Sequence, residues 1–481
     1  MRLRFTLFIF NKSLIYLIVG KAIQIAIMLS SIRIMTSLLS EKEIGQNYLL
    51  LTIVSLFTFT FLGPYNQFFS RKTVQWKGGG DLKNAMVGML FYRSFVAILS
   101  TAVALFIYSN YGEYYSNVDF ALFIFISSIG TFSLLLLSTV NLLGNPILFI
   151  KLQVLLSLCA LTLSFIFVVF INRSGMAWLY GVAITETLFI VPLFFVVTKG
   201  TRLDIKKIYH AINFESIKRL LIFTAPITLT LFLQWGQNSS YRFIVEERYS
   251  IELLGVIGVG LVVSTAIFSA VDSVACQFFN PIYFRSISNA DKNTREDAWN
   301  KYAINMLSIY IVTLLYVVTT APFLLKLLVD EKFHHVYNFV MVGALIEFCR
   351  VCCNVIYMIS QSEIDTKKTV APYILGYICL LSVLIFVDMA ETPILIPITQ
   401  AISYIVIIIF LYREMSFLLN VSLNYYYLLK VFLASSALSL CLMIPYDLSF
   451  FSSFAIVFVA GLYFVFLIYI FVYKSNQREL V

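Results

Sequence analysis

Long apolar stretches follow one another along almost the whole chain, and short polar segments separate them. A helix that crosses a bilayer needs about 20 mostly apolar residues, and by this measure the sequence holds about fourteen candidate spans. They are Ser13–Thr36, Tyr48–Phe69, Ala85–Ser109, Val118–Leu142, Phe149–Ile171, Met176–Val197, Leu220–Gln237, Leu253–Phe279, Tyr302–Leu328, Val336–Ser360, Val370–Asp388, Pro393–Tyr412, Leu428–Tyr446 and Phe450–Tyr473. The pattern predicts an all-α integral membrane protein with about 14 transmembrane helices.

The loops between these spans alternate in charge, and the alternation predicts the topology. Lys and Arg collect in the cytoplasmic loops of membrane proteins. The cationic loops carry Arg71, Lys72, Lys77 and Lys83; Lys199, Arg202, Lys206, Lys207, Lys218 and Arg219; Arg285, Lys292, Arg295 and Lys301; and Lys367 and Lys368. The acidic loops carry Glu41 and Glu43; Glu113 and Asp119; Glu246, Glu247 and Glu252; and Asp388 and Glu391. We therefore expect the cationic loops in the cytoplasm. We expect both termini there too, because Lys474 and Arg478 follow the last span, while Arg2 and Arg4 precede the first.

Composition agrees with this class. Of the 481 residues, 60% are hydrophobic and 12% are charged, and the mean hydropathy is +0.90, whereas about a quarter of the residues of a soluble domain are charged. The net charge of +9 would suggest nucleic acid as a partner of a soluble protein. In a membrane protein it reflects the cationic cytoplasmic loops. We therefore expect no nucleic-acid partner and no separate soluble domain.

Two motifs that suggest a cofactor have a simpler explanation. Gly78-Gly79-Gly80 lacks the Lys-Ser/Thr pair that follows the glycines of a phosphate-binding loop, so it is a flexible turn rather than a nucleotide site. Cys349, Cys352 and Cys353 have no neighbouring His or second Cys pair, and they are interpreted as small residues of a membrane helix. The sequence predicts no metal and no cofactor.

A shift of 210 residues relates two parts of the chain. Gly45 matches Gly255 (255 − 45 = 210), and Gln67-Phe68-Phe69 matches Gln277-Phe278-Phe279 (277 − 67 = 210). The matches predict two six-helix bundles, residues 1–210 and 211–419, followed by two additional helices in residues 420–481. An even number of spans in each copy gives both copies the same orientation, and such repeats build secondary transporters with the substrate site between the halves.

A family resemblance lies in the first two spans. The stretch from Arg33 to Gly45, RIMTSLLSEKEIG, is followed by Phe61-Leu62-Gly63 and Phe69-Ser70-Arg71. It resembles the opening helices of bacterial polysaccharide flippases, the O-antigen type within the multidrug/oligosaccharidyl-lipid/polysaccharide exporter superfamily. Residues 226–255 resemble the start of the second half of these flippases, although Tyr241 stands where many of them carry an acidic residue.

The resemblance implies a V-shaped pair of six-helix bundles in the bacterial inner membrane. Its substrate would be an undecaprenyl-pyrophosphate-linked oligosaccharide, an O-antigen or capsule repeat unit, carried from the cytoplasmic to the outer leaflet by alternating access. The implied partners are this lipid-linked substrate, membrane lipids, and the polysaccharide polymerase and chain-length machinery.

Ionisable residues within the spans are candidates for binding such a substrate, because each costs about 2.5–3.5 kcal/mol at the centre of a membrane helix on insertion scales. They are Lys21, Arg93, Glu186, Asp272, Glu347 and Arg350. We add Arg33 and Arg242, near outer helix ends, and the amide Gln237. Cations in a central cavity would hold a pyrophosphate, and amides would bind sugar hydroxyls. Two structural alternatives stay open. Arg33 and Arg242 can extend to the membrane surface, and Glu347 and Arg350, three residues apart, can neutralise each other.

Two other functions compete with a flippase. A multispan polysaccharide polymerase or ligase would be equally apolar, but such enzymes need a large outer loop with catalytic groups, and none of the loops is large. A small-molecule antiporter of the same superfamily should have an acidic cavity, whereas the candidate residues here include at least as many cations as acids. The sequence therefore favours a transporter over an enzyme.

Overall fold

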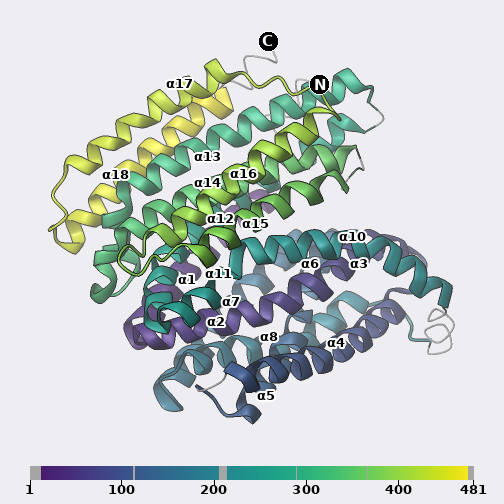
Figure 1. Ribbon diagram of the computed structural model, residues 1–481. Coiled ribbons are helices and arrows are strands. Elements are labelled where there is room, and N and C mark those ends of the chain that lie inside the picture. Colours follow the sequence, from purple (N-terminus) through teal and green to yellow (C-terminus); the bar gives the residue numbers. More distant parts are fainter. Residues whose placement is uncertain are drawn as a thin grey trace. The chain divides into compact units, whose positions relative to one another are not determined.

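The computed structural model describes residues 12–111, 114–204, 214–288, 290–363, 365 and 367–474 (Figure 1). These residues form helices and no strands, and thirteen of the helical segments are long and apolar enough to cross a membrane. The prediction of an all-α, multi-pass membrane protein is thus confirmed. The remaining predicted span, Leu220–Gln237, falls on α10 (Phe214–Ser239), which is helical but is not among the thirteen. Arg2, Arg4, Glu113, Lys206, Lys207 and Arg478, used above to predict topology, lie outside the described residues.

The chain divides into two compact units, Met1–Trp235 and Gly236–Val481. The helices of the first unit are α1 (Lys12–Leu38), α2 (Glu41–Phe57), η2 (Thr58–Leu62), α3 (Gly63–Gly78), α4 (Leu82–Tyr111), α5 (Asn117–Gly130), α6 (Phe132–Leu142), α7 (Pro146–Phe170) and α8 (Gly175–Thr198). Helix α10 begins in this unit. Helix α8 packs against α2, α5, α6 and α7, so it forms the centre of the unit, while α1 packs on α7 and α4 on α5.

Glycines permit the close contacts of α8. The Ser174 side chain caps the helix by accepting a hydrogen bond from the Ala177 N–H (3.1 Å). The next residue, Gly175, is held at both polar groups of its backbone: its N–H donates to Glu43 Oε2 (2.7 Å), and its carbonyl accepts from the Asn47 side chain (3.1 Å). A Cβ atom on Gly175 would lie 2.2 Å from the Glu43 carbonyl oxygen. Glu43, part of the segment that carries the family resemblance, thus positions the start of α8.

The second unit contains the end of α10 and then α11 (Tyr241–Arg248), α12 (Ile251–Ile287), α13 (Lys292–Leu328), η3 (Glu331–Val336), α14 (Tyr337–Ser362), η4 (Lys367–Thr369), α15 (Val370–Phe386), α16 (Leu395–Ser416), α17 (Tyr425–Ser435), η5 (Ser436–Met443), α18 (Phe450–Ile468) and η6 (Tyr469–Lys474). Helix α14 packs against α12, α13 and α16. Helices α17 and α18 pack on α13 through a small apolar cluster that contains Val312, Val431 and Leu467.

Helix starts in the two units share the shift of 210 residues. Ser40 and Ser250 (250 − 40 = 210) are both N-cap residues, and each side chain accepts a hydrogen bond from the N–H three residues later. Helices α4 and α13 begin at Leu82 and Lys292 (292 − 82 = 210). The division of the chain at residues 210 and 419 stays a prediction.

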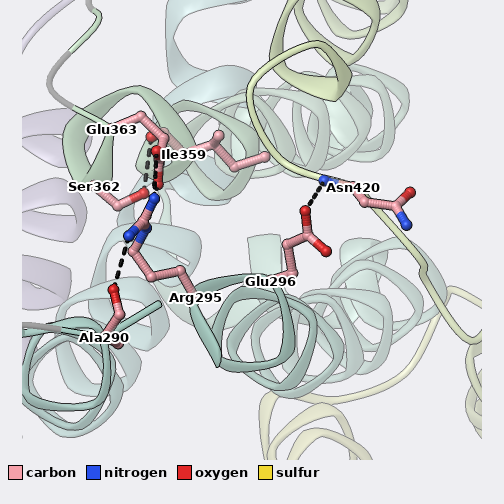
Figure 2. Close-up of polar contacts among 7 residues, drawn as sticks. All are labelled: Ala290, Arg295, Glu296, Ile359, Ser362, Glu363 and Asn420. Carbon is pink, nitrogen blue, oxygen red and sulfur yellow. Dashed lines mark hydrogen bonds and ion pairs between the residues drawn. The ribbon is translucent and has the colours of Figure 1, made fainter. Parts of the chain in front are cut away.

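Hydrogen bonds at the N-terminal end of α13 connect three parts of the second unit (Figure 2). Arg295 forms a bidentate pair with Glu363, which follows α14, at 2.8 and 3.1 Å, and also donates to the Ala290 carbonyl (2.8 Å). Glu296 Oε1 accepts the Asn420 N–H (2.9 Å). The start of α13 therefore holds both the end of α14 and the segment that leads to α17.

The packing of α8 on α7 gives a first prediction. A Cβ atom on Gly181 would lie 2.4 Å from the Ser164 N and Cα atoms, and backbone atoms cannot rotate away. We expect Gly181→Ala to destabilise the protein by about 1–3 kcal/mol, the usual cost of overpacking. Gly88→Ala is the matched control, because no heavy atom lies within 4 Å of its added Cβ. It should be neutral or stabilising by up to about 1 kcal/mol, as expected in a helix. Thermal unfolding of the two purified variants measures the difference, and equal stability would contradict the packing.

Candidate functional site

Two membrane spans of the first unit are interrupted, each by an irregular turn in its backbone. The predicted span Tyr48–Phe69 contains the π-helical turn η2 before α3 begins at Gly63-Pro64. The predicted span Val118–Leu142 is confirmed as one candidate membrane span, Asn117–Leu142, and within it α5 and α6 meet at an irregular turn at Thr131. Such interruptions are common at functional sites, and in membranes they occur where the backbone is buried in protein or lines a cavity.

Side chains satisfy the backbone groups at both interruptions. The Tyr92 hydroxyl of α4 donates to the Phe61 carbonyl in the π-turn (2.9 Å). The Tyr92 ring stacks on Tyr65, with centroids 4.4 Å apart. At the other interruption, the Thr131 hydroxyl donates to the Ser128 carbonyl (2.9 Å). These contacts compensate the irregular backbone, which bilayer lipid cannot do.

Arg93, one of the predicted site residues, connects the two interruptions. Its side chain is 1% exposed. One terminal nitrogen donates to Thr131 Oγ1 (2.8 Å) and the other to Asn66 Oδ1 of α3 (2.9 Å). The guanidinium also lies 5.3 Å from the centroid of the Phe132 ring. Arg93 therefore holds α3 against the α5–α6 junction.

A cavity of about 470 Å³ lies beside these contacts, within the size range of small-molecule sites. Its lining residues come from η2, α3, the α5–α6 junction and α6: Thr58, Asn66, Gln67, Ser70, Arg71, Thr131, Leu134, Leu135 and Ser138. Most of the polar groups are amides and hydroxyls, and Arg71 adds a guanidinium. Asn66 and Thr131, the two residues that Arg93 binds, form part of the wall. We call this the first-unit cavity.

The sequence predicted little of the first-unit cavity. Arg71 was interpreted as a cation of a cytoplasmic loop, and Gln67 only as part of the repeat. Asn66, Ser70, Thr131 and Ser138 carry no charge, so they do not stand out in an apolar span. The one available signal was Gly63-Pro64 in the middle of a predicted helix, because a proline removes a backbone hydrogen bond and marks an interruption.

The other predicted residues of the first unit lie on different helices. Glu186 on α8 contacts the α5–α6 junction, since a Cβ atom on Gly130 would lie 3.2 Å from Glu186 Cβ. It interacts electrostatically with Arg93. Lys21 on α1 donates to Gln24 Oε1 (3.0 Å) and to Gln153 Oε1 of α7 (3.5 Å). Arg33 on α1 is partly buried, so its extension to the membrane surface stays open.

The remaining candidates belong to the second unit. Glu347 and Arg350 form the expected pair on α14, with Arg350 Nη2 2.7 Å from Glu347 Oε2, and Thr265 of α12 donates to Glu347 Oε1 (2.8 Å). Asp272 on α12 accepts hydrogen bonds from the Tyr310 hydroxyl of α13 and from the Cys276 thiol (3.4 Å). The contact between Glu347 and Arg350 fits the alternative that these two residues neutralise each other. A role in substrate binding stays a prediction for Glu347, Arg350 and Asp272.

Gln237 and Arg242 lie near the outward end predicted for α10 and α11. Gln237 is buried. Its side-chain amide donates to the Ser403 hydroxyl of α16, and its backbone carbonyl accepts a hydrogen bond from the Gln400 side chain (3.1 Å). The Gln237 Oε1 atom has no hydrogen-bond partner among the described residues. Arg242 is partly buried, with its guanidinium 5.8 Å from the Tyr241 ring centroid. Within the described part of the chain, no three His, Cys, Asp or Glu side chains are grouped to hold a metal.

No known protein family matches the sequence, and no curated protein matches it. The fold, however, is that of solved membrane transporters. The lipid II flippase MurJ, in an inward closed conformation, aligns over 96% of this chain and 99% of its own, with a TM-score of 0.70 and 11% identity. An inward-facing multidrug resistance MATE family transporter of the MOP superfamily aligns over 85% of this chain and 99% of its own, with a TM-score of 0.58 and 12% identity. At these identities the likeness establishes the fold alone.

The contacts of Arg93 give a second prediction. Arg93→Ala removes two charge-assisted hydrogen bonds, each worth about 1.5–3 kcal/mol, and leaves Asn66 and Thr131 without their donor. We expect a loss of at least about 2 kcal/mol in the free energy of unfolding. Lys72→Ala, which removes an exposed cation of α3, should change it by less than about 0.5 kcal/mol. Denaturation of both purified variants measures these values, and an unchanged stability of Arg93→Ala would show that the contacts are unimportant.

Proposed function

We propose that this protein is a flippase, a secondary transporter and not an enzyme, that moves an undecaprenyl-pyrophosphate-linked oligosaccharide from the cytoplasmic to the outer leaflet by alternating access. The observation that carries the proposal is the first-unit cavity, which combines a guanidinium with amides and hydroxyls on the membrane-spanning helices of the first unit. The transporter fold and the resemblance of the first two spans to O-antigen flippases support the same function.

The chemistry of the first-unit cavity suits the head group of such a substrate. Arg71 is a guanidinium, which binds phosphate oxygens through paired hydrogen bonds. Asn66, Gln67, Ser70 and Ser138 offer amide and hydroxyl groups, which can pair with the many hydroxyls of a sugar. The cavity holds a phosphate group and a small part of the saccharide, while the polyprenyl chain stays in the lipid.

The two competing functions have less support. The residues that line the first-unit cavity include a cation and no carboxylate, whereas an antiporter for cationic drugs needs an acidic cavity. A polymerase or ligase needs catalytic side chains on a substantial outer loop, and the connections predicted to face outward between described helices, such as those from α7 to α8 and from α15 to α16, are short.

We place the protein in the bacterial inner membrane with both termini in the cytoplasm, where membrane lipids surround it. The polysaccharide polymerase and the chain-length machinery act on its product and are the proposed protein partners. The charge alternation of the loops supports this orientation, because cationic loops remain in the cytoplasm.

The orientation gives a third prediction. Cysteines at Glu247 and Asp388, both exposed, should react with a membrane-impermeant maleimide added to intact cells that are permeable only at the outer membrane. A cysteine at Lys292, also exposed, should react only after the inner membrane is opened. The unsubstituted protein controls for the seven native cysteines. Labelling of Lys292→Cys in intact cells would reverse the proposed topology.

Transport itself provides a fourth prediction. In a bacterial strain that lacks its polysaccharide flippase, the protein should restore surface polysaccharide and lower the amount of lipid-linked oligosaccharide on the cytoplasmic leaflet. Arg71→Ala should reduce transport at least tenfold, since loss of one charge-assisted contact is worth about 1.5–3 kcal/mol. Lys72→Ala is the matched control, because this adjacent cation does not line the cavity.

Expression of each variant in the membrane is measured in parallel. Full transport by normally expressed Arg71→Ala would exclude the first-unit cavity as the substrate site. If the unaltered protein instead exports cationic dyes and leaves the lipid-linked oligosaccharide in place, the antiporter is correct.

A further inference from the structure

Helices α1 and α7 form a close contact that fixes the position of Lys21. A Cβ atom on Gly20 would lie 2.3 Å from Ile150 Cγ1, so the α1 backbone rests directly on α7 at this point. Lys21 is the next residue, and its Nζ atom reaches across to Gln153 Oε1 of α7 (3.5 Å) as well as to Gln24 Oε1 on its own helix (3.0 Å). Lys21, Gln24 and Gln153 therefore form one polar group at the contact between α1 and α7, and we call it the α1–α7 cluster.

The α1–α7 cluster carries an uncompensated positive charge. Among the described residues Lys21 forms no ion pair, and both of its hydrogen-bond partners are neutral amides. Lys21 is half-buried, nine residues or about 13.5 Å along the axis from Lys12, where the described part of α1 begins. A charged group at such depth is costly unless an opposite charge or water compensates it.

The groups that the cluster leaves available to a ligand are mostly hydrogen-bond donors. An ammonium group has three N–H donors, and the amide oxygens accept two of them, which leaves one. Each glutamine uses its oxygen to hold Lys21, so the amide N–H₂ groups of Gln24 and Gln153 remain for another partner, and neither donates to a described residue. An ammonium with two flanking amide donors complements a group that is anionic and has several acceptor oxygens.

We propose that the α1–α7 cluster is a second binding site, distinct from the first-unit cavity, for a phosphate or pyrophosphate group of a membrane lipid. The ligand is either the head group of a resident anionic phospholipid or the pyrophosphate of the transported lipid. The second source rests on the proposed function. With either ligand, the site needs neutral side chains at positions 24 and 153, because a carboxylate at either position would pair with Lys21 and exclude the ligand.

The test replaces Gln153 with a carboxylate. Gln153→Glu places an acid next to Lys21, so a purely structural role for the cluster predicts unchanged or higher stability and unchanged binding. A binding role predicts a stable protein with at least tenfold weaker binding. Lys21→Gln combined with Gln153→Lys moves the ammonium group from α1 to α7 within the same cluster, and it should restore binding to within about threefold of the original, since the charge stays in place.

Binding is measured on the full chain in nanodiscs, in an Arg71→Ala background so that the first-unit cavity contributes little. Inorganic pyrophosphate in phosphatidylcholine discs is one probe, and phosphatidylglycerol added to the discs is the other. Lys151→Ala, on the same helix pair, controls for a general loss of positive charge.

Each outcome decides the proposal. Pyrophosphate binding that Gln153→Glu abolishes and phosphatidylglycerol does not displace supports the transported lipid, while displacement by phosphatidylglycerol supports a resident lipid. Equal binding by the original protein and Gln153→Glu overturns the site, as does failure of the exchanged pair to bind when it is normally folded. If the protein transports no lipid-linked oligosaccharide but binding still depends on Lys21, the proposed function fails and this site stands.

Discussion

The buried guanidinium of Arg93 is the interaction on which the first unit depends. Both helices that it connects are interrupted, and each offers one acceptor, Asn66 Oδ1 and Thr131 Oγ1, at hydrogen-bond distance. A guanidinium is planar with fixed donor directions, so it can donate to two such acceptors at once from two different nitrogens. The surrounding apolar cluster, with Phe69, Met89 and Phe132, excludes water and so strengthens these bonds. Arg93 thus joins α4 to both irregular turns and to two residues of the cavity wall.

The sequence predicted the parts of this architecture that depend on length and local spacing. Apolar stretches of sufficient length gave the helices, and the three-residue spacing gave the Glu347–Arg350 contact. It did not predict the junction at Thr131, because a threonine in an apolar run does not signal an interruption. Gln24 was within reach of Lys21 by spacing alone, but Gln153 lies 132 residues away, and only the packing of α1 on α7 brings it close. The uncharged residues of the first-unit cavity, such as Asn66 and Thr131, were missed for the same reason, because their role depends on contacts with residues distant in sequence.

The two units keep a common register but differ in chemistry. Tyr92 and Tyr302 are 210 residues apart (302 − 92 = 210), and each hydroxyl donates to the preceding helical segment, at the Phe61 carbonyl and at Asn280 Oδ1. At the same shift, Arg93 corresponds to Ala303 (303 − 93 = 210) and Leu62 to Asp272 (272 − 62 = 210). A cation of the first unit is therefore absent at the matching position of the second, where a carboxylate appears nearby. At this shift the first unit has a cation where the second has Ala303, and the second has a carboxylate where the first has Leu62.

The contacts of α13 determine how the last two helices can move. At one end Glu296 accepts the Asn420 N–H, and Asn300 accepts the Ser422 N–H and donates to the Ser422 hydroxyl. At the other end Lys326 donates to the Leu448 carbonyl (2.9 Å) between η5 and α18. Helices α17 and α18 are thus attached to the two ends of one helix 37 residues long. When α13 tilts, α17 and α18 must tilt together with it. Any displacement of α13 therefore also moves the exposed apolar side chains of these two helices, such as Leu433 and Phe451.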